Sequence, residues 1–290
     1  MCLSLESLVL WMLGYPDQAL RRSQEALTLS RELAHPFSLA HTLSFAAWFH
    51  HCYRDWPAVQ ARAEELTTLA TEQDFPLWLT QGAYWQGWLL SEQEQRAEGL
   101  AKINQAVTAW QATGAELGLP FYLSGLARAY GKVGQVAEGL SVLAEALARV
   151  NRTGERFWEA ELYQLKGELS LQSRQVQVSP EQVKARPGKS AGVSPQPPTP
   201  TLQAEAEACF LKAIEIARRQ SAKSLELRAV MSLGRLWQSQ GKKEEAQQML
   251  EEVYGWFTEG FDTTDLQKAR VLLEELSNGR RLRSRQKQLS

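Results

Sequence analysis

Short side chains recur at intervals of 40 positions along this chain of 290 residues, and this repeat constrains the fold more than any other feature. The first of them in each unit are Ala19, Val59, Gly99, Gly139, Ala206 and Ala246. In four units a second small residue follows seven positions later, which is two helical turns, so both lie on one helix face. Each unit therefore contains a helix that can approach its neighbour closely. The single interval of 67 residues, from 139 to 206, contains an insertion of 27 residues (67 − 40).

The segments within each unit carry apolar residues at helical spacing and almost no strand-like alternation. The first helix of a unit should turn five residues before the first small residue. Glycine stands at three of the five turn positions, Gly14, Gly134 and Gly241, with Arg54 and Glu94 at the other two. Glycine accepts the left-handed conformation that often ends a helix. The sequence thus predicts an all-α chain in which each unit is a helix, a tight turn and a second helix.

A second pattern lies in the first helices, where a small residue precedes the turn by seven positions and an aromatic residue can follow it by three. The small residues are Gly87, Ala127, Gly167 and Gly234, and the aromatic residues are Tyr130 and Trp237. This pattern resembles the tetratricopeptide repeat (TPR), although that repeat has a period of about 34 residues. HEAT-like pairs of about 40 to 47 residues are the alternative. The TPR resemblance implies a helical-repeat solenoid, a right-handed superhelix of about six helix pairs with a C-terminal capping helix.

The repeat assigns residues 1–172 to repeats 1 to 4 and the first helix of repeat 5. Residues 202–278 then form the second helix of repeat 5, repeat 6 and the capping helix. Between them, residues 173–201 hold six of the eleven prolines and no aromatic residue, which predicts a disordered, proline-rich insertion. Residues 279–290 carry five basic side chains and no acidic one, so we expect a basic, disordered tail that stays solvated.

Composition excludes several classes of protein. The net charge is −1, which argues against a dedicated nucleic-acid binder, and no run approaches the roughly 18 apolar residues that a membrane span needs. The apolar start of the chain does not have the features of a secretory signal. Cys2, Cys52 and Cys209 are an odd number and too scattered for a disulfide framework, which fits a reducing compartment. We therefore expect a cytoplasmic protein that binds neither nucleic acid nor membrane.

Catalytic motifs are not visible in the sequence. Gly188, Lys189 and Ser190 match the end of a phosphate-binding loop, but Val183 occupies the position where that loop needs a glycine, and prolines surround the site. No dinucleotide fingerprint, zinc-protease helix or nucleophile elbow is present. We expect no enzymatic activity, no catalytic residue and no cofactor.

The four histidines, His35, His41, His50 and His51, are clustered but do not form a metal motif. No pair of them on one helix has the i, i+4 spacing that places two imidazoles side by side. We therefore expect no metal site.

The candidate binding residues follow from the TPR resemblance, in which the first helix of each pair lines the concave face 13, 10, 6 and 3 residues before the turn. These positions hold His41, Ser44, Trp48 and His51, then Gln81, Tyr84, Trp88 and Ser91, then Phe121, Ser124 and Arg128, and finally Arg228, Met231, Arg235 and Gln238. They predict a groove with an aromatic half and a cationic half. Two alternatives remain. The aromatic side chains can instead fill the core, and Glu161, Gln164 and Glu168 can neutralise the arginines as internal ion pairs.

Three segments resemble the C-terminal repeat region of large bacterial signalling proteins that combine a nucleotide cyclase, a STAND-type AAA ATPase and TPRs. They are TGAELGLPFYLSGLARAYGKVGQVAEGLSVLAEAL, GERFWEAELYQLKGEL and GFDTTDLQKARVLLEEL. The resemblance implies a STAND-type ATPase or a nucleotide cyclase as a linked or separate partner. The chain is expected to be either a free-standing array or the C-terminal part of a larger protein.

These observations predict a non-catalytic scaffold for protein interaction and regulation that binds a peptide, a protein or an effector in its concave groove. The alternative is a sensor of small molecules with an aromatic pocket around Trp48, Tyr84 and Trp88.

Overall fold

The computed structural model describes residues 2–177 and 202–287, and the side chains of residues 2–173 and 202–277. The proline-rich stretch 178–201, with its Gly188-Lys189-Ser190 string, lies outside the described residues. Within the described part every regular element is an α-helix, and there are thirteen of them. None of these helices is both long enough and apolar enough to cross a bilayer.

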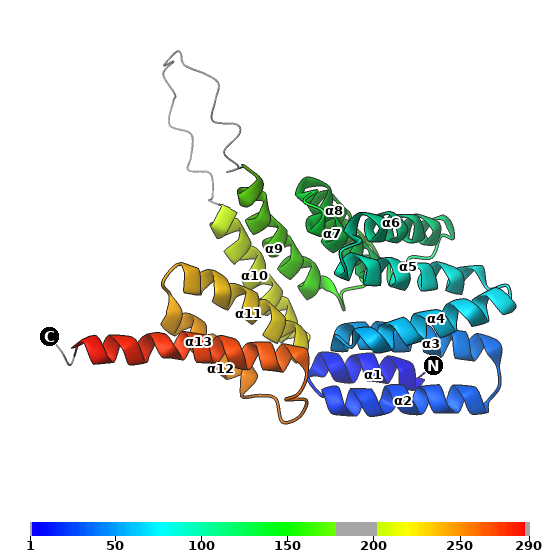
Figure 1. Cartoon of the computed structure of the whole chain (residues 1–290), viewed down its shortest axis with the longest axis horizontal. Coiled ribbons are helices and arrows are strands. Elements are labelled where there is room, and N and C mark those ends of the chain that lie inside the picture. Colours follow the sequence, from blue (N-terminus) through cyan, green and yellow to red (C-terminus); the bar gives the residue numbers. More distant parts are fainter. Residues whose placement is uncertain (1, 178–201, 288–290) are drawn as a thin grey trace, which may run out of the picture.

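The helices form six consecutive pairs and a final helix (Figure 1). The pairs are α1 (Cys2–Leu13) with α2 (Pro16–Glu32), α3 (Pro36–Tyr53) with α4 (Trp56–Glu72), α5 (Pro76–Glu92) with α6 (Arg96–Ala112), α7 (Leu119–Lys132) with α8 (Val136–Thr153), α9 (Glu159–Gln177) with α10 (Leu202–Arg219), and α11 (Lys223–Ser239) with α12 (Lys243–Tyr254); α13 (Thr264–Lys287) follows. Each helix packs against the next, and α9 packs against α10 although residues 178–201 separate them. The predicted all-α, TPR-like solenoid of six pairs and a C-terminal helix is confirmed.

Turn residues in the left-handed conformation divide the chain into helices of similar length. Before the insertion seven of them are spaced by 20 residues or a multiple of 20, and two more follow it; they are Gly14, Ala34, Arg54, Asp74, Gly114, Gly134, Gly154, Ser221 and Gly241. The turn at Glu94 is different, because Gln93 is extended with φ −93° and ψ −169°. Arg54, with φ 64°, adopts the turn conformation without being a glycine.

The small residues of the repeat allow close packing within each pair. A Cβ atom on Gly99 of α6 would lie 2.5 Å from the backbone nitrogen of Ser91 and 2.7 Å from the carbonyl oxygen of Gly87, both on α5. Such distances are shorter than real Cβ contacts, so only glycine lets these two helices approach this closely. The small residues that recur every 40 positions therefore mark the surface at which the two helices of a pair meet.

The solenoid curves until its two ends meet, as Figure 1 shows for α1 and α2 beside α11–α13. The Ser224 hydroxyl on α11 donates a hydrogen bond to the carbonyl oxygen of Trp11 on α1. The carboxylate of Glu259, in the loop before α13, accepts hydrogen bonds from the backbone N–H groups of Asp17 and Gln18 at the start of α2, at 3.0 and 3.1 Å. We call this set of contacts the end closure. Through the end closure, the first helix pair contacts the last part of the array, so the array is closed.

Two boundaries differ from the sequence prediction. Helix α9 continues to Gln177, so residues 173–177 are helical and do not belong to a disordered insertion. Helix α13 continues to Lys287, into the segment 279–290 that was predicted to be a disordered tail. The residues after Gly279 are mainly arginine, lysine, glutamine and leucine, which favour helix, and no proline interrupts them.

Candidate functional site

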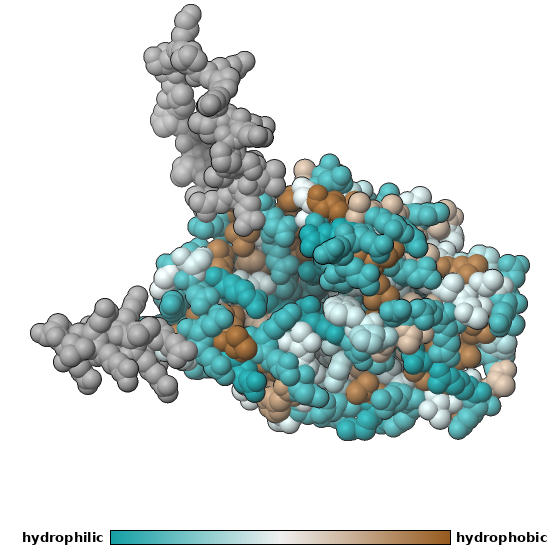
Figure 2. Space-filling view, viewed as in Figure 1, coloured by the Kyte–Doolittle hydropathy of each residue, from teal (hydrophilic) through white to brown (hydrophobic). Residues whose placement is uncertain are grey.

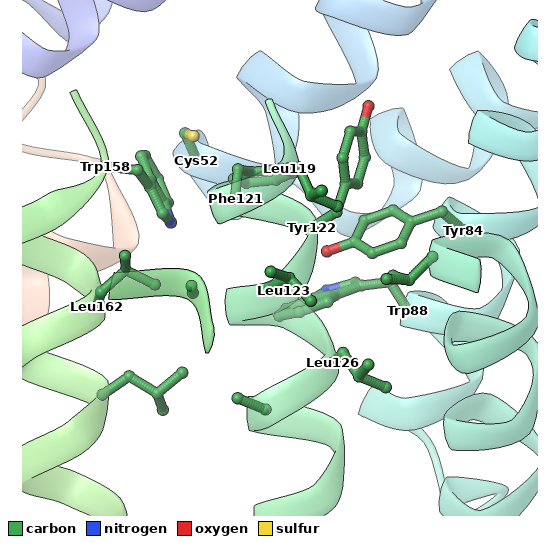
Figure 3. Close-up of a cluster of buried hydrophobic side chains, with 14 of the residues drawn as sticks. Cys52, Tyr84, Trp88, Leu119, Phe121, Tyr122, Leu123, Leu126, Trp158 and Leu162 are labelled. Atoms are coloured by element: carbon green, nitrogen blue, oxygen red, sulfur yellow. The ribbon is translucent and has the colours of Figure 1, made fainter. Parts of the chain in front are cut away.

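The aromatic residues predicted for the groove lie mostly in the core. Tyr84 and Phe121 are 1% exposed and Trp88 is 4% exposed. The rings of Tyr84 and Phe121 lie 6.1 Å apart between their centroids, and in Figure 3 Tyr84 and Trp88 point toward the helix that carries Leu123. A ligand cannot reach these three side chains in this structure. The inner face of the array is therefore largely filled by the protein's own aromatic residues.

Two polar residues of the aromatic half, Ser44 and Gln81, bond to each other. Ser44 and Gln81 are buried, and the Ser44 hydroxyl donates a hydrogen bond to the side-chain oxygen of Gln81. The His41 ring stacks on Phe45 with 4.4 Å between ring centroids. Burial lowers the pKa of His41 from its usual value and favours the neutral imidazole. This end of the predicted groove offers few free hydrogen-bonding groups.

Arg128, from the cationic half, forms internal ion pairs of the kind that the sequence left as an alternative. Its Nη2 donates to Glu161 Oε1 at 2.8 Å, and its Nη1 lies 3.4 Å from Glu168 Oε2. The Gln164 amide also donates to Glu168, at 3.2 Å. Among the predicted arginines, Arg235 is the one that is exposed.

Arg228 is 4% exposed and stands at the centre of a buried ionic network. Its Nε donates to Asp265 Oδ2 at 2.7 Å and its Nη2 donates to the carbonyl oxygen of Cys52 at 2.6 Å. Arg54 holds the other Asp265 oxygen at 2.6 Å. Burial alone would raise the pKa of Asp265, but Arg228 and Arg54 outweigh that effect and lower it. The network joins α3, α11 and α13, so it supports the end closure and is not free to bind an anion.

An apolar pocket lies between α1, α3 and the starts of α7 and α9, and we call it the inner pocket. It has a volume of about 220 Å³. Its lining comes from α1, α3 and the two segments that precede α7 and α9; the residues are Leu5, Leu8, Val9, Trp11, Met12, Phe45, Trp48, Cys52, Leu117, Gly118, Phe157 and Trp158. Trp48 is the one predicted site residue among them.

Aromatic rings form the wall of the inner pocket and apolar side chains surround its mouth. The Trp48 ring lies 5.6 Å from that of Phe157, and the Trp11 ring lies 6.4 Å from that of Trp158. At the mouth, Leu117 is 75% exposed. Leu5 and Val9, also at the mouth, are 47% and 51% exposed. The face shown in Figure 2 is mainly hydrophilic with separate hydrophobic patches. Exposed apolar side chains grouped around a pocket, as Leu5, Val9 and Leu117 are, often mark a binding site.

Groups that could support other chemistry are engaged or buried. Burial raises the pKa of the Cys52 thiol, which keeps it protonated and unreactive. Within residues 2–173 and 202–277, no group of three histidine, cysteine or acidic side chains is arranged to hold a metal ion.

The pocket residues that the sequence reasoning missed come from outside the repeat register that it used. Leu117 and Phe157 lie in the connections between pairs, and the register considered only positions inside first helices. Their proximity to Leu5 and Val9 arises because the array curves back on itself. The phrase GERFWEAELYQLKGEL, which contains Phe157 and Trp158, was the available signal.

No protein-family model matches the chain. An uncharacterized protein of Rhizobium meliloti is 25% identical over 160 residues, which cover 54% of this chain and 15% of that protein. The chain thus spans a small part of the length of this relative.

Among solved structures, the chain is similar to a signal transduction ATPase with numerous domains (STAND) from Pyrococcus horikoshii that has a tetratricopeptide-repeat sensor. The TM-score is 0.52 at 12% identity, over 96% of this chain and 38% of that protein. At this identity the likeness concerns the fold alone. The fold and the comparison together define a TPR-like helical-repeat protein.

Proposed function

We propose that this chain is a non-catalytic binding and regulatory module, in which a closed TPR-like array presents the inner pocket to the apolar group of a ligand. The observation that carries this proposal is the pocket itself, because most of the predicted groove is filled by core side chains or by ion pairs, with Arg235 exposed. A scaffold of helix pairs is suited to this role, since small rotations between pairs let binding at one place alter the whole array.

A non-catalytic role fits the state of the buried acids. Glu161 and Asp265 lie in the interior and are held by arginines. Glu159 and Glu226 are also buried and pair with Arg156 and Arg218. None of these acids lines the inner pocket. A general acid or base needs a carboxyl group that can reach a substrate.

The finer part of the proposal is a link to a signalling ATPase or nucleotide cyclase in the cytoplasm. The segments around Trp158 and Asp265 resemble the repeat region of such proteins, and the Pyrococcus horikoshii structure combines a STAND ATPase with a TPR sensor. In this arrangement the module would control the partner through the occupancy of its inner pocket. Of the two classes considered for the ligand, a protein partner uses the exposed mouth, and a small effector uses the pocket interior.

Partner capture with mouth variants tests the proposed function. The variant Leu117→Asp places a charge at the mouth, where Leu117 is 75% exposed, so folding should be preserved. Leu33→Asp is the matched control, because Leu33 is 62% exposed and does not line the pocket. We expect the tagged full chain to recover an ATPase or cyclase from cells of its source organism, and Leu117→Asp to lose that recovery while Leu33→Asp keeps it. Equal recovery by the two variants, or recovery of no such enzyme, would contradict the link.

A further inference from the structure

The lining of the inner pocket offers almost no polar surface to a ligand. Three polar groups of its lining already have partners within the protein. The N–H group of Gly118 donates to the Glu155 carboxylate at 3.0 Å, and the indole N–H group of Trp158 donates to the Ser124 hydroxyl at 3.0 Å. The carbonyl oxygen of Cys52 accepts from Arg228. The Trp48 indole nitrogen has no partner, but it is inaccessible from the pocket as well as from bulk water.

We propose that the inner pocket binds an uncharged, hydrophobic small molecule with the size of about two fused rings. This inference rests on the proposed function and specifies the ligand class of the same site. Separate observations support the charge of the ligand, its size and the dependence of its binding on the end closure.

The charge of the ligand follows from the lining. A charged or strongly polar group that enters the pocket loses its hydration and gains no hydrogen bond or counterion in return. An apolar group gives up no hydrogen bonds with water when it enters the pocket. Its binding is favourable because its surface and the exposed surface of Leu5, Val9 and Leu117 are removed from water. The pocket therefore selects neutral molecules over their ionised analogues. A polar substituent is tolerated only at the open mouth.

The size of the ligand follows from the volume. An apolar protein cavity of about 150 Å³ accepts benzene, so a pocket of about 220 Å³ accepts a molecule about half as large again. Pockets for drug-sized ligands start near 300 Å³, and an α-helix has a diameter of about 10 Å, so neither a larger ligand nor a whole helix fits inside. The flat walls made by Trp11, Trp48 and Phe157 favour an aromatic or other planar ligand.

The end closure shapes the pocket through Trp11. The ring of Trp11 lines the pocket, and the guanidinium group of Arg228 lies 4.7 Å from the ring centroid. Ser224 also holds the Trp11 backbone. Because α11 fixes one wall in this way, the closed array is the form that binds, and a ligand should stabilise it.

A pair of fluorescent probes tests the ligand class on the full chain. N-phenyl-1-naphthylamine is neutral, and 1-anilinonaphthalene-8-sulfonate is the same skeleton with a negative charge. We expect the neutral probe to bind at one site per chain with its naphthyl ring in the pocket, to be displaced by naphthalene and to raise the melting temperature. We expect the sulfonate to bind at least about tenfold more weakly, because the pocket has no cation to pair with it. Equal binding of the two probes, or no saturable binding of the neutral one, would overturn the proposal.

Two valine substitutions locate the site. Val9→Trp places an indole in the pocket, whereas Val271→Trp makes the same change on α13, outside the pocket; the two valines are 51% and 49% exposed. We expect the first variant to weaken the neutral probe about tenfold or more and the second to leave it unchanged. If both variants melt like the parent protein and bind the probe equally, the site lies elsewhere and the inference is wrong.

The outcome for a protein ligand is distinct from the outcome for the small molecule. If the neutral probe does not bind but Leu117→Asp still abolishes partner recovery, a partner's side chain occupies the pocket. The proposed function then stands and the small-molecule inference fails. If the probe binds at the pocket but no ATPase or cyclase is recovered, the small-molecule inference stands and the link to those enzymes fails.

Discussion

At the residue scale, Arg228 is a side chain that connects distant parts of the chain, since it donates a hydrogen bond to the carbonyl oxygen of Cys52, 176 positions away. Burial alone would lower the pKa of Arg228, but the carboxylates of Asp265 and Glu161 outweigh that effect and raise it, so the charge is permanent. We expect Arg228→Met to destabilise the protein by about 3 to 5 kcal/mol, because it leaves Asp265 and the Cys52 carbonyl group short of a partner in the interior. Urea unfolding followed by circular dichroism measures this change.

The matched control for Arg228 is Arg270→Met. Arg270 is 63% exposed and lies 4.0 Å from Glu274, which is itself 68% exposed. An ion pair in water contributes little to stability, so this variant should unfold at nearly the parent urea concentration. If both variants lost a similar free energy of unfolding, the ion pairs of Arg228 would stabilise the protein no more than an exposed ion pair does.

The burial of the His51 ring predicts that the protein loses stability in mild acid. Its ring lies among aromatic rings, 4.4 Å from Trp88 and 5.4 Å from Trp85, and burial together with nearby arginines holds the pKa of His51 well below its usual value. The folded chain therefore keeps this histidine neutral, while the unfolded chain binds a proton below about pH 6.5. Stability should be unaffected by this group above pH 7 and fall by up to about 1.4 kcal/mol for each pH unit below 6.5. We expect His51→Phe to reduce the fall in urea midpoint between pH 7 and pH 5.5; an unchanged fall would exclude His51 as its source.

At the element scale, α2 depends on a residue far away in the sequence for its N-terminal cap. The preceding residue, Tyr15, makes no side-chain cap, and Glu259 accepts the hydrogen bonds of the first turn instead. A carboxylate at a helix N-terminus also interacts favourably with the helix dipole. We expect Glu259→Ala to cost about 1 kcal/mol and to speed hydrogen exchange at the start of α2. Glu32→Ala, at the opposite end of the same helix, should not speed it; equal protection in both variants would count against the cap.

At the scale of the whole molecule, the two ends of the array pack closely where Gly260 meets Pro16. A Cβ atom on Gly260 would lie 2.0 Å from the Pro16 Cγ atom, and Gly260 has φ +73°. Gly241 has a similar φ of +84° but no neighbour within 4 Å of its Cβ position. Gly→Ala at either position costs about 1 kcal/mol in backbone strain. Gly260→Ala alone should also separate the ends, seen as a larger radius of gyration in small-angle scattering. The same radius in both variants would show that the closure tolerates the added methyl group.

The number and order of the helices could be predicted from the sequence because both are determined locally. Side chains seven residues apart share a helix face, and a tight turn limits each helix to its own part of the 40-residue unit, as Gly99 and Gly134 illustrate. Arg54 shows that the period, not the glycine, marks the turn. The helical end of α13 was missed because basic composition was taken to mean disorder, although arginine and lysine are good helix formers.

The candidate site could be predicted only in part. Trp48, one of the residues that the repeat register selected, lines the inner pocket, and Arg128 forms with Glu161 the ion pair that the sequence left as an alternative. The register could not show that Tyr84 and Phe121 are inaccessible, because their exposure depends on how far the array curves, and curvature is the sum of small rotations between successive pairs.

The sequence by itself determined the helices, their pairing and the faces on which they meet, since those depend on residues a few turns apart. Only the tertiary structure decided that the two ends join and that Leu5 and Leu117, from separate repeats, border one apolar pocket. The physical reason is range: helix formation and pairing are local, whereas end closure depends on contacts between residues more than 200 positions apart, such as Glu259 with Asp17.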